Sequence, residues 1–271
     1  YDRTQSLIID PVVDAASYLG GNSGDAATEG SAAVAVDNSG NSYITSRTAS
    51  SNFPTTGGDT TLGGGSDATV SKFNSSGSLV YSTYLGGTGS EVPYDIDVDT
   101  LGKAYITGTT SSSNLGVTDG STLRGTKDAF VARLSSSGTS IEFGTYIGGS
   151  TGSPAETVGN AITVDENGNF YAGGHTTASD FTTTVGAYDR TFGGGEEAWI
   201  VKYNNSDIKQ WQSLLGGNTP SAGQHEGVYG LDVDGAGNVY VTGRTQTSDF
   251  PTKNNPAQGT AGGGDDAFLS K

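Results

Sequence analysis

The chain has 271 residues, including 44 glycines and no cysteine, and its formal net charge is −16 at pH 7. A charge of this sign and size argues against nucleic-acid binding, because phosphate contacts need clustered Lys and Arg side chains. The absence of cysteine excludes disulfides, thiol catalysis and cysteine-ligated metals. No apolar run approaches the roughly 18 residues of a membrane span, so insertion into a membrane is not expected either.

The first residues are predicted to precede the folded domain. The chain starts at Tyr1 rather than Met, which predicts a processed or partial chain from which a signal peptide has been removed. Residues 1–12 are interpreted as a lead-in segment from an upstream region. Residues 13–19, which run into Gly20 and Gly21, are predicted to form one isolated β-strand. The composition, rich in Ser, Thr, Asn and Gly, is typical of secreted or cell-surface β proteins.

One pattern then repeats four times, and each copy predicts two strands joined by a tight turn. The copies are residues 34–45, 96–107, 162–173 and 231–242, anchored by Asp37, Asp99, Asp165 and Asp234. Asp accepts hydrogen bonds from the backbone just after it, and glycine adopts a positive φ. We therefore expect left-handed glycines in these turns, at Gly40, Gly102, Gly168 and Gly237.

Each pair of strands is followed by a third strand, and in the first three copies by a fourth that ends near Gly86, Gly148 or Gly216. Four strands per repeat predict the blade of a β-propeller, so the fold class is all-β with four-stranded antiparallel blades. The predicted blades are residues 31–85, 94–147, 160–215 and 229–271. Strand 13–19 is expected to complete the last blade beside residues 267–270, which would close the ring and cover an exposed edge.

Three motifs carry a resemblance to a known family. They are the V-D-x-x-G-N-x-Y-[VI]-T-G core of the repeats, the Y-L-G-G ends of their fourth strands, and the F-P-T loops at residues 53–55 and 250–252. The chain resembles the SBBP β-propeller repeat family, with blades that look like the NHL type. The family's name refers to seven blades, whereas four copies are visible here. The resemblance implies the fold and a secreted or surface location, and it implies no particular activity.

Alternating strand direction predicts two unlike faces. With the strands of a blade named a to d in chain order, the short a–b and c–d turns lie on one face. The d–a loops and the long b–c loops, at about residues 49–66, 111–127, 177–196 and 246–265, lie on the other. Because long loops on a rigid scaffold usually carry function, we assign ligand binding to this long-loop face.

Two sets of carboxylates recur on the long-loop face. The first set lies in the d–a loops, eight or nine residues before the anchoring Asp, and comprises Glu29, Glu91, Glu156 and Glu226; the second enters strand c and comprises Asp67, Asp128, Glu197 and Asp266. We favour the interpretation that they accept N–H bonds and pin the glycine-rich loops, because ligand sites are usually asymmetric. The alternative is that they bind Ca²⁺, which takes carboxylate oxygens from loops. No other cofactor is expected.

Aromatic side chains also recur along the repeats. Tyr43, Tyr105, Tyr171 and Tyr240 lie in strand b, and Phe130, Trp199 and Phe268 lie in strand c. These residues are predicted to pack between blades. Trp211, in an outer strand, is interpreted as having no counterpart in the other repeats and as a candidate surface contact.

Signals for catalysis are few. His175 and His225 are the only histidines and lie in no H-E-x-x-H pattern, and no G-x-S-x-G elbow occurs. The chain is therefore predicted not to be an enzyme, and no catalytic residue is assigned. The favoured function is binding, adhesion or scaffolding outside the cell, with a protein or glycan on the long-loop face. The alternatives are a self-assembling subunit of a filament or surface layer, and a polysaccharide hydrolase or lyase.

Overall fold

The computed structural model describes residues 16–23, 32–217, 225–254 and 256–271, and within them every regular element is a β-strand. The expected lead-in at residues 1–12 lies outside the described residues. The described residues include no helix with the length and apolar character that crossing a membrane requires.

The strands form four antiparallel sheets in which consecutive strands are neighbours. The first sheet contains β1 (Ala32–Val36), β2 (Ser42–Thr48), β3 (Asp67–Phe73) and β4 (Leu79–Leu85), and the second contains β5 (Glu91–Val98), β6 (Ala104–Thr110), β7 (Asp128–Leu134) and β8 (Ile141–Ile147). The third contains β9 (Thr157–Val164), β10 (Phe170–Thr176), β11 (Glu197–Tyr203) and β12 (Lys209–Leu215), and the fourth contains β13 (Gly227–Val233), β14 (Val239–Thr245) and β15 (Asp266–Ser270).

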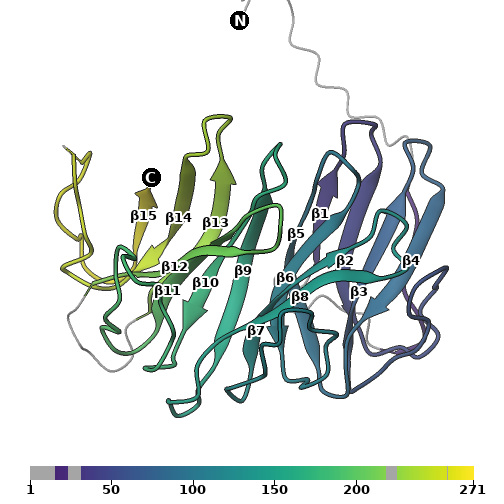
Figure 1. The fold of residues 1–271 in the computed structure, drawn as a ribbon, viewed down its shortest axis with the longest axis horizontal. Coiled ribbons are helices and arrows are strands. Elements are labelled where there is room, and N and C mark those ends of the chain that lie inside the picture. The colour runs from purple at the N-terminus through teal and green to yellow at the C-terminus, as the bar shows by residue number, and fades with distance from the viewer. Residues whose placement is uncertain (1–15, 24–31, 218–224, 255) are drawn as a thin grey trace, which may run out of the picture.

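The sheets stand side by side in chain order (Figure 1). The first strand of each sheet packs on the sheet before it: β5 lies against β1, β2 and β3, and β9 lies against β5, β6 and β7. The same holds for β13, which lies against β9, β10 and β11. Repeated sheets that face one another in this way are the blades of a β-propeller, so the predicted fold class is confirmed. We call the four sheets blades 1 to 4.

The a–b turns have the predicted conformation. Gly40, Gly102, Gly168 and Gly237 have φ values of 76°, 76°, 79° and 78°. In the first turn, Asp37 Oδ1 accepts the N–H groups of Ser39 and Asn41, at 2.9 and 3.0 Å. Asp99, Asp165 and Asp234 accept the corresponding pairs of N–H groups. The anchoring Asp therefore shapes each hairpin from within, because its side chain replaces backbone partners that the turn leaves open.

A matched pair of glycines in the last a–b turn tests this role. A Cβ atom on Gly237 or on Gly235 would meet nothing within 4 Å, but only Gly237 has a positive φ. We expect Gly237→Ala to destabilise the protein by about 1 kcal/mol, because an L side chain disfavours the left-handed region. Gly235→Ala is the control, and it should change the free energy of unfolding by only a few tenths of the change expected for Gly237→Ala. Urea unfolding of both variants measures the difference, and equal stabilities would contradict the assignment.

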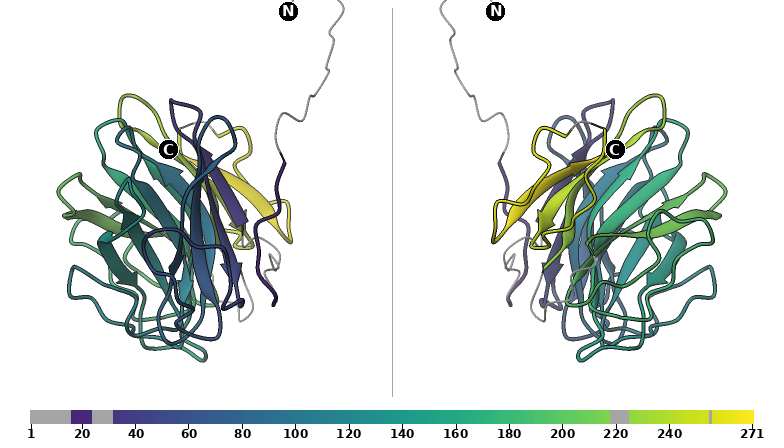
Figure 2. Two further views of the ribbon diagram at one scale, coloured as in Figure 1. Left: turned by 90° about the vertical axis from the view of Figure 1, so that its right-hand side faces the viewer. Right: turned by 90° about the vertical axis from the view of Figure 1, so that its left-hand side faces the viewer.

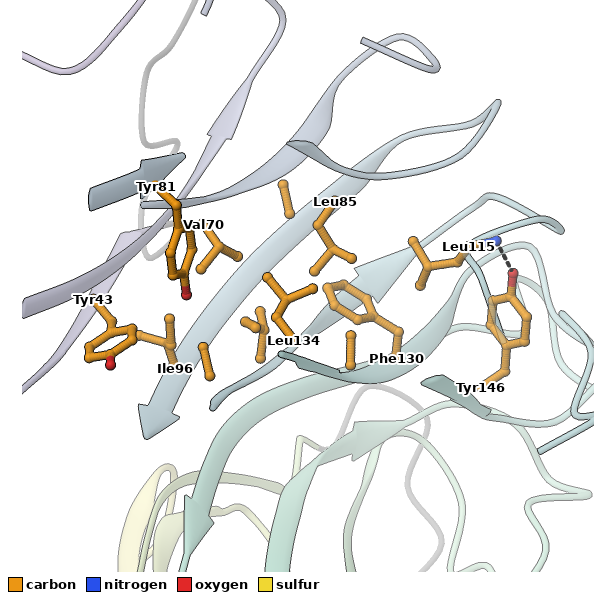
Figure 3. Packing of buried hydrophobic residues seen from close by; sticks show 13 residues of the cluster. Tyr43, Val70, Tyr81, Leu85, Ile96, Leu115, Phe130, Leu134 and Tyr146 are labelled. Carbon is orange, nitrogen blue, oxygen red and sulfur yellow. Dashed lines mark hydrogen bonds between the residues drawn. The ribbon is translucent and has the colours of Figure 1, made fainter. Parts of the chain in front are cut away.

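The core lies in the junctions between blades. Figure 3 shows the first junction, where Val70 and Leu85 of blade 1 face Ile96 and Phe130 of blade 2. In strand c, Phe130 and Trp199 are fully buried and Phe268 is nearly so, which confirms the expected packing of these aromatic residues.

Trp211 does have counterparts in the other repeats. It lies opposite Lys202, in the register that places Tyr81 opposite Lys72 and Phe143 opposite Arg133. The interpretation of Trp211 as unmatched is therefore wrong. An aromatic residue at this point of strand d is part of the repeat in all three blades whose fourth strand is described.

The strands of blade 1 and blade 4 do not pair with each other in the described part of the chain. Blade 1 and blade 4 occupy opposite ends of the row, and the side views show the same arc (Figures 1 and 2). Within the described chain β15 pairs with β14 alone, and residues 16–19, the described part of the expected closing strand, form no strand. Residues 13–15 lie outside the described residues. Closure of the ring by the chain's own residues 16–19 is thus not observed.

Candidate binding face

The carboxylates that enter strand c pin the long b–c loops. Each accepts the N–H of the residue four positions earlier, so each closes a small loop on itself. The four bonds join Asp67 to Gly63, Asp128 to Arg124, Glu197 to Gly193 and Asp266 to Gly262. The geometry is the one that the loop-pinning hypothesis requires, in all four blades.

Burial of these carboxylates changes their acidity. Asp67, Asp128 and Glu197 are almost completely inaccessible to solvent. Burial raises the pKa of Asp67 to about 6 and that of Glu197 to about 8, and it also raises the pKa of Asp128. Because the neutral form of a carboxyl group is favoured where water is excluded, Glu197 is largely protonated at neutral pH and is a poor ligand for a cation.

In the first set of carboxylates, only Glu91 and Glu226 occupy equivalent positions in the described residues. Glu91 and Glu226 are buried, and each accepts a glycine N–H of the preceding d–a loop together with two hydroxyl hydrogens of its own blade. In blade 3 the same position holds Thr157, fully buried and bonded to Thr176 at 2.8 Å. The prediction that Glu156 is equivalent to Glu91 and Glu226 is wrong by one residue. The Glu156 carboxylate is part-exposed and forms an ion pair with Lys127, with Oε1 3.2 Å from Nζ. Glu29 lies outside the described residues.

Cation binding by these carboxylates remains testable. No group of three or more Asp, Glu or His side chains in the described chain is placed to hold a metal ion. We expect the melting temperature to stay constant when EDTA and then millimolar Ca²⁺ are added, because each carboxylate that enters strand c already accepts a loop N–H. A bound ion at a hundredfold excess over Kd would stabilise the fold by about 2.7 kcal/mol. Calorimetry would then show a rise of several degrees, contradicting the prediction.

The two histidines meet on the long-loop face, although they belong to different blades. His225 Nδ1 lies 2.9 Å from Glu196 Oε2, and His175 Nδ1 lies 3.9 Å from Glu196 Oε1. Asn160 Nδ2 is 3.1 Å from His175 Nδ1 and donates to the carbonyl of Val228. Burial lowers the pKa of His175, so its ring is neutral at neutral pH and Nδ1 accepts the amide hydrogen of Asn160.

A chain of polar contacts continues from this pair across blade 4. The N–H of His225 donates to Gln246, Gln246 donates to Asp265 at 2.7 Å, and Arg244 Nε lies 3.5 Å from the same carboxylate. The ring of Tyr229 lies beside that of His175, with centroids 6.5 Å apart, and half of this tyrosine is exposed. We call His225, Glu196, Tyr229, Arg244 and Asp265, together with His175 and Gln246, the blade 3–4 cluster.

Sequence reasoning missed the blade 3–4 cluster because its members come from five separate segments of the chain. One signal was available. The second-last residue of strand b differs in every repeat except for two arginines: it is Arg47, Thr109, His175 and Arg244. The residue just before strand c varies as well, from Ser66 to Lys127, Glu196 and Asp265. Positions that vary within an otherwise regular repeat are where a ligand-specific surface is expected.

The row of blades and the pinned loops define the class of protein: a β-propeller-repeat protein, whose fold is that of a generic binding or scaffolding module. Three segments of the chain match the family model "SBBP: Beta-propeller repeat", at residues 80–116, 142–182 and 227–251. These three segments therefore match the SBBP repeat that the motifs suggest. No curated protein matched the chain.

Two of the three matched segments cross from one blade to the next, and the third, residues 227–251, lies within blade 4. The first covers most of β4 and then β5 and β6, and the second runs likewise from β8 through β9 and β10. The family repeat thus starts in strand d of one blade and ends in the b–c loop of the following blade. Each of these two matched segments consequently contains one blade junction, which is where the core lies.

Proposed function

We propose that the chain is a secreted or cell-surface binding module, and that the blade 3–4 cluster on its long-loop face contacts a glycan. The observation that carries the proposal is a half-exposed aromatic ring, Tyr229, surrounded by accessible hydrogen-bonding groups. The side chains of His225, Arg244 and Asp265 are 45%, 37% and 54% exposed. A sugar offers an apolar C–H face to an aromatic ring and hydroxyl groups to polar side chains, and this surface provides both.

Pinning of the loops supports the proposal. Glu197 holds the b–c loop of blade 3 directly beside Glu196, and Asp266 holds that of blade 4 directly beside Asp265. Loops that are ordered before binding lose little entropy when a ligand arrives. The strand ends and pinned loops therefore present the cluster as a preformed surface.

The experiment is a glycan array probed with the 271-residue chain and two matched variants. Tyr229 follows Glu226 by three residues, and Tyr94 follows Glu91 by three residues, so Tyr94 is the equivalent residue of blade 2. We expect Tyr229→Ala to weaken glycan binding at least tenfold, as loss of a central aromatic contact does. Tyr94→Ala should leave the affinity unchanged.

Three results would contradict the proposal. The first is binding to a protein partner with no glycan bound, which would favour the protein ligand. The second is release of reducing ends from a bound polysaccharide, which would assign the chain to the hydrolases or lyases. The third is an unchanged glycan affinity of the Tyr229→Ala variant, which would show that the contact lies outside the blade 3–4 cluster.

A further inference from the structure

A large apolar groove lies beside the open edge of blade 4. Its volume is about 1000 Å³, and it runs between β15 and the outer strand β12 of blade 3. Apolar and aromatic side chains line it, including Ile200, Trp211, Leu215, Phe250 and Phe268. On the groove side, β15 has no hydrogen-bonded neighbour in the described chain.

In the other blades a fourth strand fills this space. In blade 2 the strand is β8, and Figure 3 shows its Tyr146 beside Leu115. The Tyr146 hydroxyl donates to the carbonyl of Ser112 at 2.6 Å and accepts the N–H of Leu115 at 3.0 Å. Tyr84 of blade 1 makes the same two bonds, with Ser50 and Phe53. The groove thus has the position of the fourth-strand seat of blade 4.

The described N-terminal residues have the contacts of the end of a fourth strand. The N–H of Asn22 donates to Asn52 Oδ1 at 2.9 Å, and that of Ser23 donates to Ser50 Oγ at 2.8 Å. The residues that follow β4 bind blade 2 in the same way: Thr88 donates to Asn114 and Gly89 donates to Ser112, at 2.9 and 2.8 Å. Residues 16–19 therefore leave blade 1 where the fourth strand of an adjoining blade would end. Tyr18 is fully exposed there.

The two end faces of the row are also uncovered. Val34 and Val36 of β1 are 63% and 62% exposed, whereas the counterpart of Val34 in β5, Ile96, is 3% exposed. At the other end Leu269 of β15 is 76% exposed, whereas its counterpart Ile200 is 8% exposed. Each end thus presents exposed apolar side chains whose counterparts at the internal junctions are buried or part-buried.

We propose that β15 of one copy of the chain accepts residues 16–19 of a second copy as its fourth strand. The register follows the internal blades, in which Ala129, Phe130 and Val131 lie opposite Ile147, Tyr146 and Thr145. Leu19, Tyr18 and Ser17 then lie opposite Ala267, Phe268 and Leu269. Tyr18 enters the groove, and its hydroxyl bonds to Thr247 and Phe250. Strand addition to an open edge supplies the backbone hydrogen bonds, and the groove supplies side-chain contact.

The same association between two copies also covers the exposed end face of each copy at the contact. Residues 21–23 remain on blade 1 of the donor copy, so its β1 comes to lie over β15 of the acceptor. Val34 and Val36 then meet the face that carries Leu269. A second copy is the donor because blade 1 and blade 4 of one copy stand at opposite ends of the row (Figure 1).

The absence of cysteine from the chain allows a clean cross-linking test. Ser17→Cys and Leu269→Cys are introduced into separate copies, which are mixed and oxidised. Residues directly opposite on antiparallel strands have Cα atoms within disulfide reach. We expect a disulfide-linked pair of chains from this mixture. Leu101→Cys is the control, because Leu101 is 71% exposed in an a–b turn of blade 2, and its mixture with Ser17→Cys should give no excess of linked pairs.

Light scattering adds a readout that does not depend on the disulfide. The unmodified chain should associate in solution, and Tyr18→Ala should shift it to the monomer while its circular dichroism stays unchanged. A monomeric unmodified chain would overturn the proposal. So would a disulfide formed within a single chain that carries both Ser17→Cys and Leu269→Cys, because that result shows closure of the ring by its own strand.

Discussion

Replacing Glu197 by glutamine is expected to stabilise the protein, and the gain should grow as the pH rises from 5 to 8. Burial raises the pKa of this carboxyl to about 8 from an ordinary value of 4.5. In the unfolded chain the group ionises near pH 4.5, whereas in the fold it keeps its proton until about pH 8. The wild-type fold is thus fully favoured below pH 4.5 and loses stability as the pH rises through 8.

Glutamine has the shape of the protonated acid and does not titrate. The Glu197→Gln variant therefore does not lose stability as the pH rises, as the wild type does. Linkage gives a relative gain on the order of 3 kcal/mol between pH 5 and pH 8. Urea unfolding at both pH values measures it. Glu166→Gln, at an exposed position in an a–b turn, is the control and should show no comparable change. A Glu197→Gln variant whose advantage is the same at both pH values would mean that Glu197 is ionised in the fold.

Gly174→Ser should be among the most damaging single substitutions in the chain. A Cβ atom on Gly174 would lie 1.9 Å from the carbonyl oxygen of Val158. At this point β9 has a bulge, because Ala161 pairs with Gly173 and Gly159 pairs with Gly174, which leaves Asn160 unpaired. The bulge brings the two backbones together, and relieving the clash requires the strands to separate.

We expect Gly174→Ser to cost about 3 kcal/mol, the upper end of ordinary overpacking. Blade 1 supplies the control, because Ser46 occupies the corresponding place, opposite Ala32, with no bulge in the described register. Ser46→Ala should cost only about 1 kcal/mol, through the loss of its hydrogen bond to Thr69. Denaturant midpoints compare the two variants. A Gly174→Ser protein as stable as Ser46→Ala would show that the bulge adapts freely.

The features that were predictable from sequence are those decided by nearby residues. An Asp followed three residues later by glycine fixes each a–b hairpin, so the strand order of every blade followed from the repeat. Carboxylate pinning was predictable for the same reason, since Asp67 bonds to Gly63 within one loop. These interactions join residues two to four positions apart, which a repeat pattern records directly.

The errors arose where the outcome depends on register or on distant segments. Glu156 was placed with Glu91 and Glu226 although it lies nine residues before its anchoring Asp rather than eight. Thr157, eight residues before Asp165, occupies the equivalent place. The contact of His175 and His225 with Glu196 depends on how blade 4 packs on blade 3, which no local pattern encodes. The open ends depend on the arc of the whole row, and therefore closure could not be judged from matching strand motifs.

Binding through the long-loop face is tested most directly by amide hydrogen exchange, with and without the ligand that the glycan array selects. Bound ligand should slow exchange at residues 225–229 and 244–246, and leave the a–b turns at residues 37–41 and 99–103 unchanged. Slower exchange confined to those turns would place the ligand on the opposite face and contradict the account.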